Sequence, residues 1–214
     1  MRGLFITFEG PDGSGKTSQV KRLAARLQNT GIDVVITREP GGTGIGDRLR
    51  SIVLSPEHRE MADQTEVLLY AASRAQHVHQ VIFPALERGA VVICDRFIDA
   101  SIAYQGYGLG QDPAQVEAIS RYASSGLQPH RTYMLDVPVE ISRSRLLKRS
   151  GAGGSESTLD RIELKDKDYH GRVRDAFLLL AKTNPHRVLL LNADRAEEEI
   201  AGDIAADFDR LLNK

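Results

Sequence analysis

The chain has 214 residues, 41% of them hydrophobic and 27% charged, which is enough for one buried core beneath a hydrated surface. Its 28 basic and 29 acidic side chains nearly balance, and this excludes the basic excess that non-specific binding to nucleic acid or to an anionic membrane requires. No apolar run is as long as a membrane span, and the first run, which ends before Glu9, is too short for a signal peptide. The single cysteine, Cys94, lies in an apolar run, so we expect a buried residue in a cytoplasmic protein.

Short apolar segments alternate with helical patterns along the chain. Buried strands are predicted at 4–8, 34–37, 90–94, 132–137 and 188–191. A first helix follows the opening strand and runs to Leu27, and further helices are predicted at 65–81, 113–124, 138–148, 165–183 and 196–212. This alternation indicates parallel strands with helices on both faces of the sheet. We therefore predict an α/β fold with a five-stranded parallel sheet, formed by a single domain over residues 1–214.

One stretch of low complexity, residues 150–155, lies between two predicted helices and consists of glycine, serine and alanine. Glycine and serine leave the backbone free to adopt many conformations, so we expect a mobile loop within the domain. A linker between two domains is the alternative. The sequence that follows is too short to build a core of its own, which favours the loop.

A glycine-rich segment between the first strand and the first helix matches the pattern G-x-x-x-x-G-K-[ST]. Its residues are Gly10, Pro11, Asp12, Gly13, Ser14, Gly15, Lys16 and Thr17. Glycines let backbone N–H groups surround a phosphate, and the following helix adds the positive end of its dipole. Lys16 supplies a positive charge for the β- and γ-phosphates, and the Thr17 hydroxyl is a ligand for Mg²⁺. The chain lacks the Asn-Lys-x-Asp motif with which GTPases bind guanine, so we expect ATP in this loop.

Polar segments follow the second and third strands directly. Arg38 and Glu39 begin the turn after the second strand, and Asp95 and Arg96 follow the third. Ligands of open parallel sheets bind at the carboxyl ends of the strands, so these side chains are expected at one site. Asp95 is suited to hold Mg²⁺ through water, and the planar guanidinium of Arg96 is suited to phosphate oxygens. A plain turn and a structural Asp–Arg pair are the alternatives.

Two further pairs of residues have a spacing that suits a ligand. Tyr70 and Arg74 lie one turn apart on the predicted helix 65–81, so a ring that stacks on a base and a guanidinium that binds its edge would share one face. Ordinary packing is the alternative. Arg149 and Arg161 flank the glycine- and serine-rich loop, where arginines are able to close over a transferring phosphate. Solvated charges at the ends of a loop are the other explanation.

Together these segments resemble the bacterial thymidylate kinase family. The likeness rests on residues 8–17, 38–43, 68–77, 95–97 and 104–106, which occur in the family's order. The resemblance implies a P-loop fold of the nucleoside monophosphate kinase type, with a short flexible lid at about 148–162. It also implies transfer of the γ-phosphate of ATP to dTMP with Mg²⁺, and a homodimer.

The resemblance assigns roles to individual positions. Residues 10–17 would bind ATP, with Asp12 near the metal and the sugar of the acceptor, and Thr17 and Asp95 would be the metal ligands. Tyr70 stands where the family usually has a phenylalanine beneath the thymine ring. The implied substrate-binding residues are Arg38, Glu39, Arg50, Tyr70, Arg74, Asp95, Arg96, Ser101, Tyr104 and Gln105.

The family places its catalytic arginine either in the P-loop or in the lid. Positions 11–14 carry no basic residue here, whereas the lid region holds Lys148, Arg149 and Arg161. The chain thus resembles the lid-arginine type, and the implied catalytic residues are Lys16, Arg96, Asp12, Arg149 and Arg161. Since positions 151–158 contain no arginine, the choice between Arg149 and Arg161 stays open.

Two other functions share parts of this pattern. Another nucleotide or deoxynucleoside kinase would have the same loop and strand order but a different acceptor pocket. A non-catalytic P-loop switch would bind ATP without turnover that depends on an acceptor. The histidines add little, since no cysteine or carboxylate cluster completes a zinc site, and we expect them to be solvated or to cap helices.

Overall fold

The computed structural model describes residues 3–149 and 159–212, and within them five parallel strands form one sheet. The strands are β1 (Leu4–Glu9), β2 (Val34–Arg38), β3 (Val91–Asp95), β4 (Arg131–Asp136) and β5 (Val188–Asn192). Their order across the sheet is β2-β3-β1-β4-β5. The predicted five-stranded parallel sheet is therefore confirmed.

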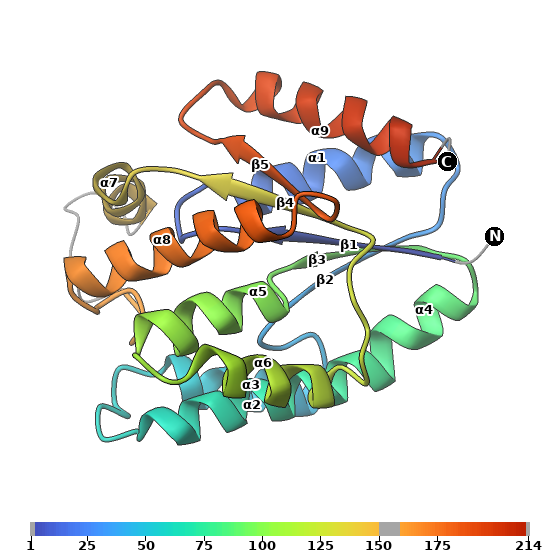
Figure 1. Cartoon of the computed structure of the whole chain (residues 1–214). Helices are drawn as coiled ribbons and strands as arrows, with labels where there is room; N and C mark the ends of the chain where they lie inside the picture. Colours follow the sequence, from blue (N-terminus) through green and yellow to red (C-terminus); the bar gives the residue numbers. More distant parts are fainter. Residues whose placement is uncertain (1–2, 150–158, 213–214) are drawn as a thin grey trace.

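Helices cover both faces of this sheet (Figure 1). One face packs against α1 (Lys16–Asn29) and α9 (Glu197–Leu212). The other helices and two π-helical segments are α2 (Gly44–Leu54), α3 (Asp63–His77), η1 (Val78–Ile82), α4 (Phe83–Glu87), α5 (Ile98–Ser101), η2 (Ile102–Gly108), α6 (Pro113–Ala123), α7 (Val139–Arg149) and α8 (Lys167–Thr183). Figure 1 places α2, α3, α4, α6 and α8 on the opposite side of the sheet from α1 and α9.

The central strands are buried on both faces, as their near-continuous apolar sequences indicate. Ile6 of β1 and Ile93 of β3 are register partners, and both pack with Leu23 of α1 in the core between the sheet and α1 and α9. On the other face Phe5 of β1 packs with Cys94 of β3. Cys94 is fully buried, which confirms the expected burial of this side chain.

Two parts of the fold have no counterpart in the sequence prediction. Helix α2 begins with two glycines within its first three residues, which hides its periodicity, and the side chain of Thr43 caps it by accepting the N–H of Gly46. The α5–η2 segment contains Gly106 and Gly108 and is mostly buried.

The predicted helix 65–81 is α3, which continues through η1 into α4.

The strand order brings three chain segments to one edge of the sheet. Strand β3 lies between β1 and β2, with Asp95 in register with Phe8 on one side and with Arg38 on the other. The glycine-rich loop, the Arg38–Glu39 turn and the Asp95–Arg96 turn therefore meet at the carboxyl ends of these strands, as predicted.

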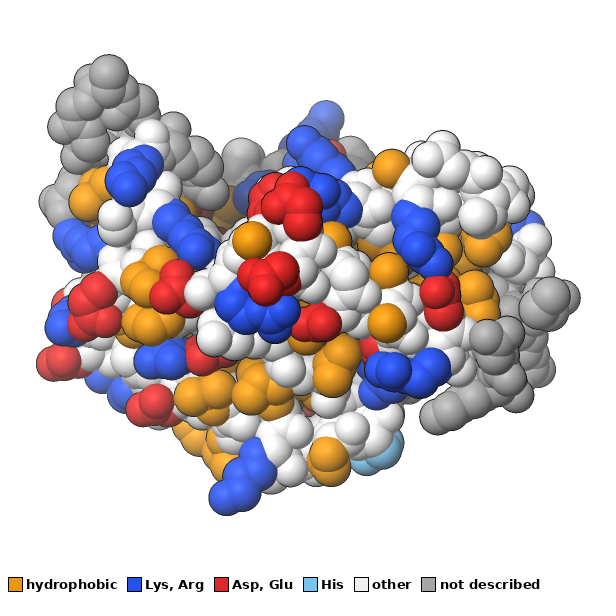
Figure 2. All heavy atoms as spheres, turned by 90° about the horizontal axis from the view of Figure 1, so that it is seen from above, with side chains coloured by type: hydrophobic (Ala, Val, Ile, Leu, Met, Phe, Trp, Pro, Cys, Tyr) orange, Lys and Arg blue, Asp and Glu red, His pale blue; other side chains and the backbone are white. Residues whose placement is uncertain are grey.

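The face formed by α1 and α9 carries basic and acidic side chains in alternation (Figure 2). Arg22 pairs with Glu198 at 2.8 Å, and Arg26 pairs with Asp209 at 2.7 Å, so ion pairs join the two helices. This face has no patch of a single sign. In residues 3–149 and 159–212 no helix combines the length and the apolar character needed to cross a membrane.

Candidate active site

Residues 10–17 form a loop from the end of β1 to the start of α1. Gly10 has φ 128°, and a Cβ at this position would overlap the carbonyl oxygen of Leu135. Gly15 has φ 92° and immediately precedes α1, whose first N–H groups lack partners within the helix. The loop lines a cleft of about 670 Å³. It thus has the geometry of a phosphate-binding loop.

Lys16 is buried at the base of this cleft. Its ammonium group donates to the carbonyl oxygens of Gly10 (3.0 Å) and Pro11 (2.8 Å). Burial and the Arg96 guanidinium lower the pKa of Lys16 to about 8, and the carboxylates of Asp12 and Asp95 oppose this shift. A phosphate in the cleft would favour the charged ammonium further.

Arg96 lies at the centre of the site and has a left-handed backbone conformation, with φ 71°. Its guanidinium donates to Gly10 O (2.9 Å), to Asp12 Oδ1 (2.7 Å) and to the hydroxyl of Tyr104 (3.1 Å). That hydroxyl in turn donates to Asp12 Oδ2 at 3.1 Å. Burial alone raises the pKa of Asp12, but Arg96 and Lys16 together hold it well below its usual range. Asp12 and Arg96 are therefore a charged pair.

Glu9 holds the backbone next to Arg96, a role that the sequence analysis missed. Its Oε1 accepts the backbone N–H of Phe97 at 2.7 Å, directly after Arg96. Its Oε2 is buried and has no hydrogen-bond partner in the described part of the chain. Burial and the Asp99 carboxylate raise the pKa of Glu9 to about 8, so the group is largely protonated at neutral pH.

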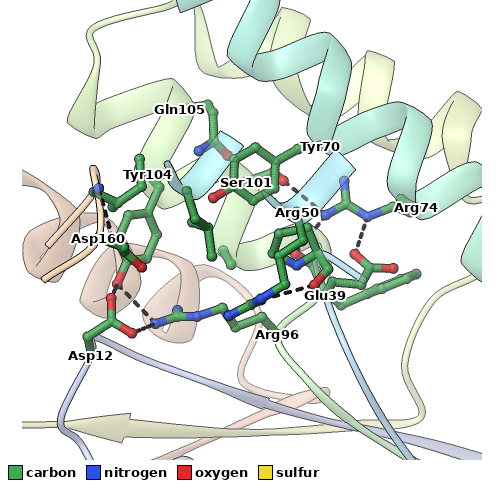
Figure 3. A pocket seen from close by; sticks show the side chains of 15 residues that line it. Asp12, Glu39, Arg50, Tyr70, Arg74, Arg96, Ser101, Tyr104, Gln105 and Asp160 are labelled. Atoms are coloured by element: carbon green, nitrogen blue, oxygen red, sulfur yellow. Dashed lines mark hydrogen bonds and ion pairs between the residues drawn. The ribbon is translucent and has the colours of Figure 1, made fainter. Parts of the chain in front are cut away.

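A second, narrower cavity of about 60 Å³ adjoins the cleft. Figure 3 shows Asp12 and Arg96 at one end of it, and Tyr70 and Arg74 toward the other. The two cavities share Asp12, Glu39, Arg50, Arg96 and Asp160. Every residue implied for substrate binding lines at least one of them: Arg38 and Asp95 line the cleft, and Tyr70, Arg74, Ser101, Tyr104 and Gln105 line the narrower cavity.

Arg74 is almost completely buried and is held by its neighbours. Four of its five N–H groups donate, to Glu39 Oε2 (2.8 Å), to Ser120, to the carbonyl of Phe97 and to Ser101. The other oxygen of Glu39 lies 3.0 Å from His77 Nδ1. Glu39 therefore orients Arg74 in this structure.

The expectation that all histidines are solvated or cap helices is wrong for His77. Its ring has no exposed surface and lies between Glu39 and the Thr37 hydroxyl, which is 2.6 Å from Nε2. The helical pattern places position 77 on the buried face of α3. A carboxylate from another segment, which makes burial of the ring favourable, is visible only in three dimensions.

Basic side chains converge where the two cavities meet. Arg50 donates to the carbonyl oxygen of Pro40 at 3.0 Å, and Arg38 donates to Asp47 at 3.2 Å. Burial and the charges of Arg38 and Arg96 lower the pKa of Arg50. Mutual repulsion among these groups favours an anionic ligand between them.

The donor set for a magnesium ion is present beside the P-loop. The Thr17 hydroxyl donates to Asp95 Oδ2 at 2.9 Å. No group of three His, Cys, Asp or Glu residues that suits a metal occurs in the described residues. Mg²⁺ usually takes one or two protein oxygens together with water and substrate phosphates, so the Thr17–Asp95 pair fits that ion.

The structure describes the side chain of only one of the two arginines implied for the lid. Arg149 ends α7, its side chain lies outside the described part of the structure, and so do residues 150–158 of the implied lid. Arg161 is buried, donates to Glu66 Oε2 at 2.5 Å and to the carbonyl oxygen of Val53 at 2.9 Å, and does not line the cleft. Its neighbour Asp160 lines both cavities. Burial, with the nearby carboxylates of Glu163 and Asp12, raises the pKa of Asp160 to about 6.

The fold and site define a P-loop phosphotransferase of the nucleoside monophosphate kinase class. The cleft of its phosphate-binding loop adjoins an arginine-lined cavity, and Arg96 lines both. The model of the thymidylate kinase family matches residues 8–204, and the chain belongs to this family.

Similar proteins cover the chain almost completely. A thymidylate kinase of Exiguobacterium sibiricum is 49% identical over the whole chain and 98% of its own length, and one of Geotalea uraniireducens is 46% identical over 95% of each chain. The crystal structure of thymidylate kinase from Ehrlichia chaffeensis superposes with a TM-score of 0.78 at 32% identity, and the match covers 97% of this chain and 99% of that one.

The burial of Glu9 predicts a pH dependence of stability. Its pKa is raised from 4.5 to about 8 on folding, so its stabilising contribution is fully present below pH 4.5 and is lost as the pH rises through 8. Glu9→Gln removes this titration. Between pH 5 and pH 8.5 we expect the wild type to lose about 4 kcal/mol of unfolding free energy relative to the variant, since each pKa unit corresponds to about 1.4 kcal/mol.

Urea denaturation of both proteins across this pH range measures the difference. The control is Glu57→Gln, which changes an exposed glutamate and is expected to give a difference that does not vary with pH. A wild type and a Glu9→Gln variant with parallel stability curves would contradict the prediction.

Proposed function

We propose that this protein transfers the γ-phosphate of ATP to dTMP, with Mg²⁺, and so forms dTDP. The observation that carries the proposal is the shared wall of the two cavities, where Arg96 contacts Gly10 and Asp12 of the P-loop and lines both cavities. A donor phosphate on the loop and an acceptor phosphate in the second cavity would both meet this guanidinium. Membership of the thymidylate kinase family supports dTMP as the acceptor.

Phosphoryl transfer depends on position and charge more than on covalent chemistry. Lys16 and the N-terminus of α1 bind the β- and γ-phosphates of ATP, and Arg38, Arg50 and Arg96 hold the acceptor phosphate in line. Its oxygens are largely ionised near neutral pH, so no general base is needed. Thr17 and Asp95 would hold Mg²⁺, which supplies positive charge to the phosphate oxygens when it is bound.

The acceptor base is recognised by α3 and η2. The Tyr70 ring provides a stacking surface, and burial and Glu66 raise its pKa, so the phenol stays neutral. Beyond its four contacts within the described residues, Arg74 has one further N–H for the edge of the base. The narrowness of the cavity favours a pyrimidine over a purine. Arg149 is the proposed lid arginine.

We also propose a homodimer that works in the cytoplasm. Helices α2, α3 and α6 expose apolar side chains, namely Ile52, Leu68 and Tyr122, and such a surface is suited to a second copy. Light scattering is expected to give a mass of about 47 kDa, twice 23.6 kDa. Leu68→Asp should lower it toward 23.6 kDa, whereas Leu179→Asp on the exposed side of α8 should not. A monomeric wild type would refute the dimer.

The reaction itself is tested by ADP release from ATP and Mg²⁺, with dTMP, dUMP, CMP and thymidine offered separately. We expect strong turnover with dTMP, weaker turnover with dUMP and negligible turnover with CMP or without an acceptor. Preference for another acceptor would point to a different nucleotide kinase. ATP binding without acceptor-dependent turnover would point to a P-loop switch.

Arg96→Ala is expected to lower kcat by about 10³-fold, since it removes the cation shared by donor and acceptor phosphates. Steady-state assays at saturating ATP and dTMP measure the effect. Arg88→Ala is a suitable control, because Arg88 pairs with Asp33 in a half-exposed ion pair far from the site. Turnover of Arg96→Ala close to that of the wild type would remove Arg96 from the mechanism.

A further inference from the structure

We propose that Arg161 is a positioning residue, which the buried carboxylate of Glu66 couples to the acceptor cavity. The inference rests on the proposed function, because the cavity concerned is the proposed dTMP site. It replaces the catalytic role that the sequence resemblance implied for Arg161. Glu66 thereby gains a function that its sequence context alone does not show.

One carboxylate joins two segments that are far apart in the sequence. Glu66 lies on α3 and is 1% exposed. Its Oε2 accepts from Arg161 Nη2 at 2.5 Å, and its Oε1 accepts from Gln105 Nε2 at 2.9 Å. Gln105 lines the acceptor cavity, so Glu66 connects that wall directly to the segment around Arg161.

Further contacts fix this segment to the end of α2. The side chain of Arg161 donates to Val53 O at 2.9 Å, and its backbone N–H donates to Leu54 O at 3.0 Å. The residues on either side, Asp160 and Ile162, both line the acceptor cavity. Anchoring Arg161 therefore places an acidic and an apolar side chain against the acceptor.

The geometry separates positioning from direct catalysis. The Arg161 side chain is 8% exposed and is absent from the described lining of the P-loop cleft. Leaving that position to reach a phosphate would strand the buried Glu66 carboxylate without its cation, which is strongly unfavourable. Arg161 thus acts through Asp160, Ile162 and Gln105 in this structure.

The substitutions Glu66→Gln and Arg161→Met test this coupling. Gln105 and Arg161 both donate to Glu66, and a glutamine at 66 offers one accepting oxygen, so one of the two contacts is lost. Arg161→Met keeps an apolar stem and removes the donors. Each change is expected to raise the KM for dTMP by about 10- to 100-fold, because the acceptor is misplaced, while the KM for ATP stays within about twofold.

The double variant, Glu66→Gln with Arg161→Met, is the decisive test of the coupling. Since both changes break the same connection, its KM for dTMP is expected to match that of the more affected single variant. Arg161→Lys retains a cation for Glu66 and guards against loss of folding, with an expected rise of a few fold in the KM for dTMP. Lys167→Met removes an exposed cation nearby and serves as the matched control. All assays are run below the melting temperature of every variant.

Several results would overturn the inference. A fall in kcat of about 10³-fold in Arg161→Met, with Glu66→Gln unaffected, would make Arg161 catalytic. Lower melting temperatures with unchanged KM values would make the pair merely structural. Additive effects in the double variant would show two independent roles. A wild type without dTMP-dependent turnover is distinguishable from all of these, because it overturns the proposed function and this inference together.

Discussion

The ion pair between Arg96 and Asp12 is the contact on which the site depends. It requires Arg96 to take a left-handed backbone conformation, φ 71°, which costs a residue with a side chain on the order of 1 kcal/mol or more. The Phe97 N–H bond to Glu9 and the contacts of the guanidinium with Gly10 and Tyr104 offset that cost. Because Glu9 ends β1 and Arg96 follows β3, the parallel pairing of these strands brings the two halves of the site together. The sheet therefore determines where the cation lies between the two cavities.

Buried ion pairs hold several arginines in and around the acceptor side. Glu39 holds Arg74, Glu66 holds Arg161, and Asp99 holds Arg187 behind the α5 segment. Such pairs contribute little net stability, since desolvation offsets their attraction, but the loss of one partner is costly. Each pair thus restricts its arginine to one position. A cavity that must distinguish similar small molecules benefits from that restriction, because misplacement by about 1 Å lowers rates strongly.

Local signals explain what the sequence could predict. The P-loop, the five strands and the polar turns after β2 and β3 follow from short patterns, and the parallel order then places them at one edge. Helix α2 was missed because its glycines suppress the helical pattern. The contacts of Glu9, Glu66 and Arg161 could not be predicted from sequence, because each depends on a partner 88 or 95 residues away in the chain. A basic residue near a lid is compatible with catalysis and with anchoring, and only the buried carboxylate of Glu66 separates the two.

The near balance of charge in the whole chain also holds at the site, where four basic and five acidic side chains of the described residues line one cleft. Outside the site, several cations form surface pairs, such as Arg26 with Asp209. Within it, Lys16, Arg38, Arg50 and Arg96 face one cleft together. Burial, and to a lesser extent the neighbouring cations, lowers the pKa values of Lys16 and Arg50. Two phosphate groups that approach each other repel. Cations placed between the phosphates offset that repulsion, and this lets a protein of almost no net charge bring two polyanions into contact.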